Sequence, residues 1–440
     1  MKTSICMAAI VFISSLSSVT VAAVTTEIKP YTLQYAVNQA LELDPWLTAN
    51  NLREQSALHL SEGATSLPDP KFNMGIKNLP TDTFDFDQEG MTQFSIGMSQ
   101  MFPRGDTLAL KGLKYQQKAN QQPYLRQERQ AAVKLKVTEL WLTALQAQMS
   151  IDLINQNRSL FEQLSDIATS SYSSAFGRAR QQDLVRAELE LTSLEDRLTQ
   201  LYQQKEIALQ KLHPWLIPAG EHRTNRITVK SQLPNLKLKA DYNATNPKLI
   251  QHLTKNPRVL VIDQGIAMAS TDIQLAEQKF KPEWMLNANY GFRADTPTGA
   301  DRADLFSLVV SVDLPVFSTK KQDSAVKAAS SEKEALKTDR LLLLRNLQAQ
   351  YNSSKAKLDR LDNRYQLYQE QLLPGLAETA ETAINGYTVD DGTFAEVVRA
   401  RISELNSRLA ALNINVQRQK TIAAINYVLT QAGNAGVTEQ

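Results

Sequence analysis

Cysteine is almost absent from this chain, and glycine and proline are scarce. The 440 residues contain one cysteine, 16 glycines and 16 prolines. The single cysteine, Cys6, lies in an N-terminal segment that we expect to be removed. The mature chain then has no disulfide, no thiolate metal ligand and no cysteine that carries a lipid. So few glycines and prolines also argue against an ordinary all-β protein.

Long hydrophobic runs and a strong net charge are missing as well. Beyond the N-terminal segment, no stretch of 18 unbroken apolar residues occurs, so we expect no transmembrane helix. The formal net charge is only +2, which argues against nucleic-acid binding because that function favours strongly basic patches. The composition leaves a polar, largely helical protein as the starting expectation.

The N-terminal segment, residues 1–23, predicts a secretory signal peptide. Lys2 precedes an apolar run, and the small residues Val21, Ala22 and Ala23 satisfy a cleavage rule. The alternative is an N-terminal membrane anchor, but the apolar run is short and is broken by serines.

The rest of the chain repeats itself. The stretch Phe94–Pro103 matches Phe306–Pro315 without a gap, and the same shift along the sequence pairs Pro45 with Pro257 and Pro70 with Pro282. Such self-similarity indicates two homologous halves. We assign them to residues 24–212 and 251–440, and we expect the linker 213–250 to form an irregular belt packed around the helices.

Each half contains two segments in which apolar and polar residues alternate. These segments predict strands over residues 72–78, 92–102, 284–292 and 306–316. The even-numbered positions are apolar and the odd ones mostly polar. One alternative is a soluble sandwich with a buried apolar face. Strands of this length and pattern are typical of transmembrane β-barrels, yet four strands cannot close a barrel. We therefore expect a barrel that several chains share.

Long helices follow the strands of each half. Apolar residues recur every seven positions from Val133 to Ala168, and the returning segments show 3/4 spacing, which predicts coiled-coil packing. We expect helical hairpins over residues 103–212 and 318–430. The first helix would span about 100 Å, with Pro123 kinking or interrupting it.

These segments together resemble one known family. "LPDPKFNMGIKNLPTDTF" and "MTQFSIGMSQMFPRGDTLALKG" resemble the heavy-metal branch (similar to CzcC and CusC) of the TolC-type outer-membrane efflux proteins. The resemblance implies an α+β membrane protein in the outer membrane: a homotrimer with a twelve-stranded barrel and a helical coiled-coil tube in the periplasm. It further implies two partners, a periplasmic adaptor protein and an inner-membrane pump of the resistance-nodulation-division type.

The resemblance also suggests candidate site residues. Acidic residues of the family ring the periplasmic entrance, and Glu396 matches one such place, whereas Arg399 stands where some relatives carry a second acid. The candidate gate residues are Asp183, Arg186, Asp390, Asp391, Glu396 and Arg399. Asp390 and Asp391 alternatively cap the returning helix. The adaptor-docking tips comprise Ala175, Phe176, Gly177, Arg178, Val389, Gly392 and Thr393.

The loop between the first two strands is acidic. It carries Asp82, Asp85, Asp87 and Glu89, which form either a solvated surface loop or a cation-attracting mouth. The methionines Met74, Met91, Met98 and Met101 cluster around this hairpin, where packing explains them better than a soft-metal relay does.

No motif indicates an enzyme. We find no nucleophile arrangement or phosphate loop, and the histidines His59, His213, His222 and His252 lack metal-ligand spacing. We expect no cofactor and no resident metal. The sequence favours an exit duct for heavy-metal cations. The alternatives are the same duct for drug efflux or type I protein secretion, and a periplasmic coiled-coil adaptor.

Overall fold

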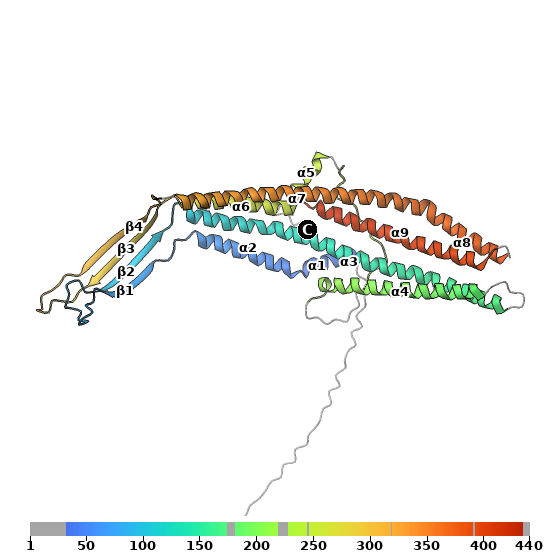
Figure 1. Cartoon of the computed structure of the whole chain (residues 1–440), viewed down its shortest axis with the longest axis horizontal. Helices are drawn as coiled ribbons and strands as arrows, with labels where there is room; N and C mark the ends of the chain where they lie inside the picture. The colour runs from blue at the N-terminus through green and yellow to red at the C-terminus, as the bar shows by residue number, and fades with distance from the viewer. Residues whose placement is uncertain are drawn as a thin grey trace, which may run out of the picture.

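The computed structural model describes residues 32–173, 181–218, 228–243, 246–317, 319–389 and 392–433. Inside helices, the side chains at positions 164, 165, 168, 171, 183 and 184 lie outside this description. So does the predicted signal peptide, residues 1–23. The molecule is elongated, with a small sheet at one end and a long helical body (Figure 1). The expected combination of mostly helix with a small sheet is therefore confirmed.

The sheet consists of four antiparallel strands in the order β1-β2-β3-β4. Their bounds are Lys71–Lys77, Gln93–Phe102, Glu283–Phe292 and Leu305–Asp313. Each half of the chain supplies one hairpin, and β2 pairs with β3 to join the halves. The strands begin and end within one residue of the predicted positions, except that β4 stops at Asp313 rather than at Val316. Hydrophobic periodicity alone is enough to predict these strands, because each strand has one apolar face.

The two faces of the sheet differ in chemistry. The even-numbered residues form an apolar face whose side chains are exposed, with Met74 at 65% and Val310 at 58%. Met74 and Met98 both belong to this face, as their positions in the register show. On the odd-numbered face of β2, Ser95 is buried and its hydroxyl donates to the carbonyl of Gly75. A soluble sandwich would bury the apolar face instead, and no described segment covers it.

Helices make up the body. Those of the first half are α1 (Leu33–Glu42), α2 (Pro45–Ala64), α3 (Thr107–Ser173) and α4 (Gln181–Leu216). Those of the second half are α5 (Pro247–Leu253), α6 (Pro257–Gln278), α7 (Lys320–Leu367), α8 (Leu373–Thr388) and α9 (Phe394–Val428). A π-helical turn, η1 (Tyr368–Leu372), joins α7 to α8. Next to the sheet, α2, α3, α6 and α7 lie side by side in that order (Figure 1).

Of the two expected effects of Pro123, a kink or an interruption, the interruption is wrong. Helix α3 runs through Pro123 without a break for 67 residues, which corresponds to about 100 Å. Proline costs helix stability because it lacks an N–H and crowds the preceding turn. Contacts on both sides hold the helix here: the amide of Asn50 donates to Gln122 at 2.9 Å, and that of Gln121 donates to the carbonyl of Val261 at 2.9 Å. Tertiary packing outweighs the local preference.

The internal repeat is visible in the helix starts. Asp44 caps α2 and Asn256 caps α6, and each side chain accepts the backbone N–H two residues ahead. Pro45 and Pro257 occupy the first helical position in both cases, where a missing N–H costs nothing. These two prolines, which align in the sequence repeat, therefore have the same structural role in both halves.

The corner between α1 and α2 is fixed by a buried ion pair. The carboxylate of Asp44, only 2% exposed, accepts from Arg129 Nε of α3 at 2.8 Å while it also caps α2. The guanidinium of Arg129 lies between the rings of Trp46 and Trp215, 5.8 and 5.5 Å from their centroids. One arginine thus ties together α2, α3 and the end of α4.

The segment between the halves packs against the helices. Helix α4 extends beyond the predicted end at residue 212, to Leu216. Residues 228–243 then run over the second half: the N–H of Leu236 donates to Gln419 of α9, and the N–H of Tyr242 donates to the hydroxyl of Tyr351 of α7, both at 2.7 Å. The described part of this segment is held by side chains of the helices.

Candidate functional site

The polar face of the sheet carries rows of small and amide side chains. One row runs across all four strands as Asn73, Gly97, Asn289 and Ser307. A Cβ at Gly97 would meet the amide oxygens of both asparagines, so a larger residue there would displace these two side chains. Met101 and Met285 are opposite each other on this same face, an exception to the expected polar pattern. Hydrogen-bonding groups dominate the face, which suits contact with water.

The acidic loop connects β1 to β2 at the end of the sheet remote from the helices. Asp82, Asp85, Asp87 and Glu89 are all exposed. A hydrogen bond from Gln88, with help from backbone N–H groups, lowers the pKa of Asp82. Arg302 donates to the carbonyl of Asp87 at 3.1 Å, and thereby ties this loop to the β3–β4 connection. The loop is ordered by such contacts while its carboxylates remain open to solvent.

A cluster of charges joins the sheet to the helices. Arg104 donates to the carbonyls of Lys279 and Lys281 at 3.0 and 3.1 Å and forms an ion pair with Asp313. Lys281 in turn binds Asp106 at 2.9 Å. This joint was not predicted from the sequence. The available signal was the two charged residues that follow Pro103, Arg104 and Asp106.

The helical tip lies at the far end of the molecule. Ala175, Phe176, Gly177, Arg178, Asp390 and Asp391 lie outside the described residues, as does the side chain of Asp183. Within the described part, Val389 is 73% exposed. Gly392 is closely packed, because a Cβ there would stand 3.0 Å from the backbone nitrogen of Tyr387. The described turn therefore combines an exposed apolar side chain with a tight backbone.

Thr393 and Glu396 form a capping box at the start of α9. Thr393 Oγ1 accepts the N–H of Glu396 at 3.3 Å, and the Glu396 carboxylate accepts the N–H of Thr393 at 3.1 Å. Such reciprocal bonds satisfy two backbone donors at the helix start. The cap of α9 is thus Thr393 rather than Asp390 or Asp391. Glu396 and Arg399, both exposed, share no ion pair within the described residues.

The first turns of the two returning helices share one hydrophobic cluster. Ala187 of α4 and Phe394, Val397 and Val398 of α9 all belong to it. Arg197 of α4 also donates to Asn406 of α9 at 2.6 Å. The fold therefore brings together the helices that carry Arg186 and Arg399. Val185 and Leu189, on the same stretch of α4 as Arg186, are exposed apolar residues.

A buried carboxylate further along α9 was not predicted from the sequence. Glu404, whose side chain is 5% exposed, binds Arg401 at 2.8 Å and Arg408 at 2.5 Å. The spacing of three and four residues places all three on one side of the helix. That spacing was the available signal, but similar spacings on exposed surfaces are common.

Solved structures provide the decisive comparison. CusC, whose structures concern folding and transmembrane channel formation, is 16% identical, with a TM-score of 0.74 over 91% of this chain and 92% of that chain. The outer-membrane channel OprN is also 16% identical, with a TM-score of 0.74 over 90% and 89%. This chain has the fold of outer-membrane channel proteins.

The open state of the MtrE outer-membrane channel from Neisseria gonorrhoeae shares this channel fold. It is 15% identical, with a TM-score of 0.72 over 90% of this chain and 88% of that chain. No protein-family model and no curated protein sequence matches the chain.

Among the helices that the structure describes, none has the length and apolar composition of a transmembrane span. No group of three or more His, Cys, Asp or Glu side chains in the described part of this channel fold could hold a metal ion. Of the histidines, His252 is fully engaged: its ring nitrogens contact the Tyr242 hydroxyl and the Leu429 carbonyl, each at 2.9 Å.

Proposed function

We propose that the protein is the outer-membrane exit duct of a tripartite efflux system. The main support for this proposal is the difference between the two faces of the sheet. The apolar face is exposed, and the polar face bears amides and hydroxyls. Exposed apolar residues alternating with polar ones suit strands with lipid on one side and water on the other. The likeness to outer-membrane channels supports the same conclusion.

Strands of neighbouring copies of the chain would complete the four-stranded sheet. In the described structure β1 pairs only with β2, and β4 pairs only with β3. Unpaired backbone groups at such edges are costly in lipid. We propose that β4 of one chain pairs with β1 of the next, and that three chains close a barrel of twelve strands.

The helical body forms the duct through the periplasm. Four adjacent helices per chain would give a wall of twelve in the trimer, and the length of α3 suits the distance to an inner-membrane system. In this proposal the tip docks on a periplasmic adaptor through Val389, Gly392, Thr393 and the adjoining tip residues. An inner-membrane pump supplies the energy, so the duct needs no covalent chemistry.

Heavy-metal cations are the cargo that we propose. The support is the sequence resemblance to the heavy-metal branch and the acidic loop, whose four carboxylates per chain would give twelve at one mouth. Drug efflux and type I protein secretion use the same architecture and remain the alternatives. Transport assays with an identified pump and adaptor, comparing metal ions with organic dyes, would decide the cargo.

A periplasmic coiled-coil adaptor is the competing function. It explains the helices but leaves the exposed apolar sheet without a purpose. Fractionation separates the two: the duct should float with the outer membrane, whereas an adaptor should leave with the inner membrane or the soluble periplasm.

Purified protein should conduct ions across planar lipid bilayers without nucleotide, and the tip should control the conductance. We expect Arg186→Ala combined with Arg399→Ala to raise the single-channel conductance and strengthen cation preference, because the double variant removes two cations beside the entrance.

Arg364→Ala, an exposed arginine on α7 away from the tip, is the matched control and should conduct like the wild type. Unchanged conductance and selectivity in the double variant would show that these arginines do not gate the entrance. Absence of any conductance in the wild type would count against the duct itself.

A further inference from the structure

A groove with a charged rim lies where the helices meet the sheet. Its walls are α2 and α6, its base is α3, and its volume is about 690 Å³. Leu60, Met268 and Leu275 supply apolar surface, while Lys111, Lys114 and Lys118 stand along one side of α3. The three lysines are three and four residues apart, so they form a single stripe. Apolar surface beside a row of cations suits an anionic, amphiphilic ligand.

The charges in the groove do not cancel. Lys114 is paired with Asp272 at 2.5 Å, and His59 lies 3.8 Å from Glu62. Lys111 and Lys118 are exposed and form no ion pair within the described residues. Two uncompensated ammonium groups therefore line the groove, and an anion would complement them.

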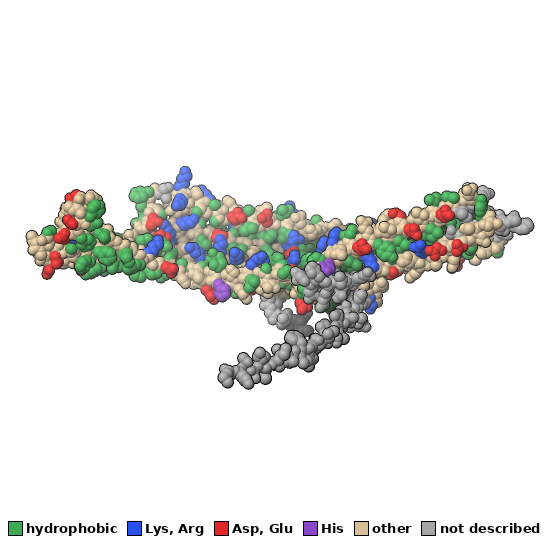
Figure 2. All heavy atoms as spheres, turned by 90° about the horizontal axis from the view of Figure 1, so that it is seen from below, with side chains coloured by type: hydrophobic (Ala, Val, Ile, Leu, Met, Phe, Trp, Pro, Cys, Tyr) green, Lys and Arg blue, Asp and Glu red, His purple; other side chains and the backbone are tan. Residues whose placement is uncertain are grey.

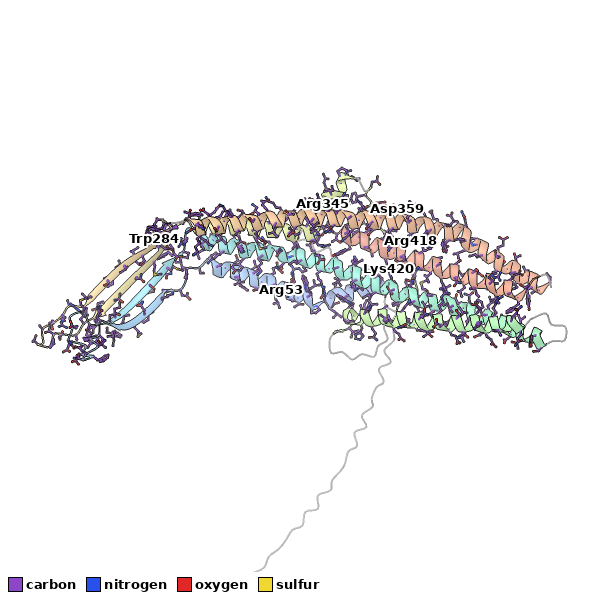
Figure 3. All side chains as sticks on the ribbon, in the orientation of Figure 1. Arg53, Trp284, Arg345, Asp359, Arg418 and Lys420 are labelled. Carbon is purple, nitrogen blue, oxygen red and sulfur yellow. The ribbon has the colours of Figure 1, made fainter. Side chains whose placement is uncertain are left out.

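The position of the groove points to a particular anion. Trp284 lies at the helical end of the sheet (Figure 3), directly opposite Phe102, and both rings are exposed, at 47% and 40%. Exposed aromatic side chains mark the boundary between lipid and water in membrane proteins. Helix α3 begins five residues after Phe102, and Lys111 follows about 6 Å along it. Lipid headgroups extend roughly 5–8 Å beyond the hydrocarbon on each side, so Lys111, the lysine of the groove closest to the start of α3, lies nearest to them.

Lys118 lies about 10 Å further from the sheet. A lysine extends its methylene stem along apolar surface and keeps its ammonium in water, so Lys118 can reach toward the membrane along the groove. Figure 2 shows Lys and Arg side chains interspersed with hydrophobic ones on the helical part next to the hydrophobic surface of the sheet. The sequence repeat places Asp323 and Ser330 at the equivalent positions of the second half, so this stripe belongs to the first half alone.

We infer that this groove binds the headgroups of anionic phospholipids in the periplasmic leaflet of the membrane. The inference rests on the proposed membrane position of the sheet. Lys111 and Lys118 supply the charge, and the apolar surface accommodates the adjoining parts of the lipid. A trimer would carry three such sites around the base of its barrel.

The test uses the full protein in nanodiscs of phosphatidylethanolamine containing a minor fraction of phosphatidylglycerol. Lipids retained after mild detergent extraction are quantified by mass spectrometry. We expect the wild type to retain phosphatidylglycerol above its bulk fraction, more strongly at low salt. Basic side chains near a membrane surface contribute about fivefold each to anionic-lipid binding, so Lys111→Gln with Lys118→Gln should remove most of the enrichment. Lys211→Gln, an exposed lysine of α4 remote from the sheet, should retain it.

The inference would be overturned if the wild type retained phosphatidylglycerol only at its bulk fraction. It would also be overturned if the double variant enriched this lipid as strongly as the wild type does. A double variant with unchanged lipid but altered ion selectivity would overturn it too, because the groove would then face the lumen. Failure of the wild type to enter nanodiscs as a trimer would instead contradict the proposed function. The two failures are therefore distinguishable.

Discussion

Val310→Arg should abolish assembly in the outer membrane, whereas Ser311→Arg on the next residue should permit it. Val310 is 58% exposed on the apolar face of β4, and Ser311 is exposed on the opposite face. An arginine facing lipid near the bilayer midplane costs about 2–4 kcal/mol per chain, and three chains multiply the effect. An arginine on the polar face meets water and should alter ion selectivity instead.

The measurement is the amount of heat-resistant oligomer in isolated outer membranes, on gels without boiling. Because the two variants place the same side chain on adjacent residues of one strand, differences in charge, size and strand propensity largely cancel. Equal loss in both variants would mean that the strand tolerates no arginine for reasons other than lipid. Equal assembly in both would mean that the apolar face does not meet lipid.

Arg129→Ala should loosen the corner between α1 and α2 more than any substitution of an exposed ion pair. The change leaves the buried carboxylate of Asp44 without its cation and removes the group that lies between Trp46 and Trp215. Breaking a buried pair by removing one partner costs about 3–5 kcal/mol. Local opening should therefore increase a hundredfold or more, read as faster amide hydrogen exchange over residues 45–50.

Asp44→Asn is the companion variant. Asparagine caps helices about as well as aspartate, so this change removes the charge and keeps the cap. In the Arg129→Ala background, Asp44→Asn should restore part of the protection, because no buried charge then remains. If Asp44→Asn made the Arg129→Ala protein worse, the ion pair would not be the source of stability and aromatic packing would explain the loss.

The sequence predicts those parts of the molecule that depend on periodicity and internal repetition. Alternating residues from Phe94 to Phe102 require one apolar face, whatever surrounds the strand, so strand and faces follow from local pattern. The repeated prolines locate helix starts for the same reason, since Pro45 and Pro257 fit only a first turn. These features carry most of the fold.

Features that depend on tertiary context were harder to predict. Pro123 disfavours an isolated helix, but contacts with neighbouring helices keep α3 continuous at that residue. The joint at Arg104 forms only because Lys279, Lys281 and Asp313 arrive from a distant part of the chain. At the tip, the competition for capping α9 between Thr393 and the aspartates before it could not be settled by residue type, because all of them are good caps.

The proposed barrel requires that the sheet continues from one chain to the next. The most direct measurement is disulfide trapping between an introduced cysteine on β1 and one of a panel on β4, in native outer membranes. The only natural cysteine, Cys6, lies in the predicted signal peptide, so the background is clean. We expect some β1–β4 pairs to link the chains into species up to the trimer, whereas control pairs between β2 and β3 should link only within one chain. Monomers alone for every β1–β4 pair would contradict it.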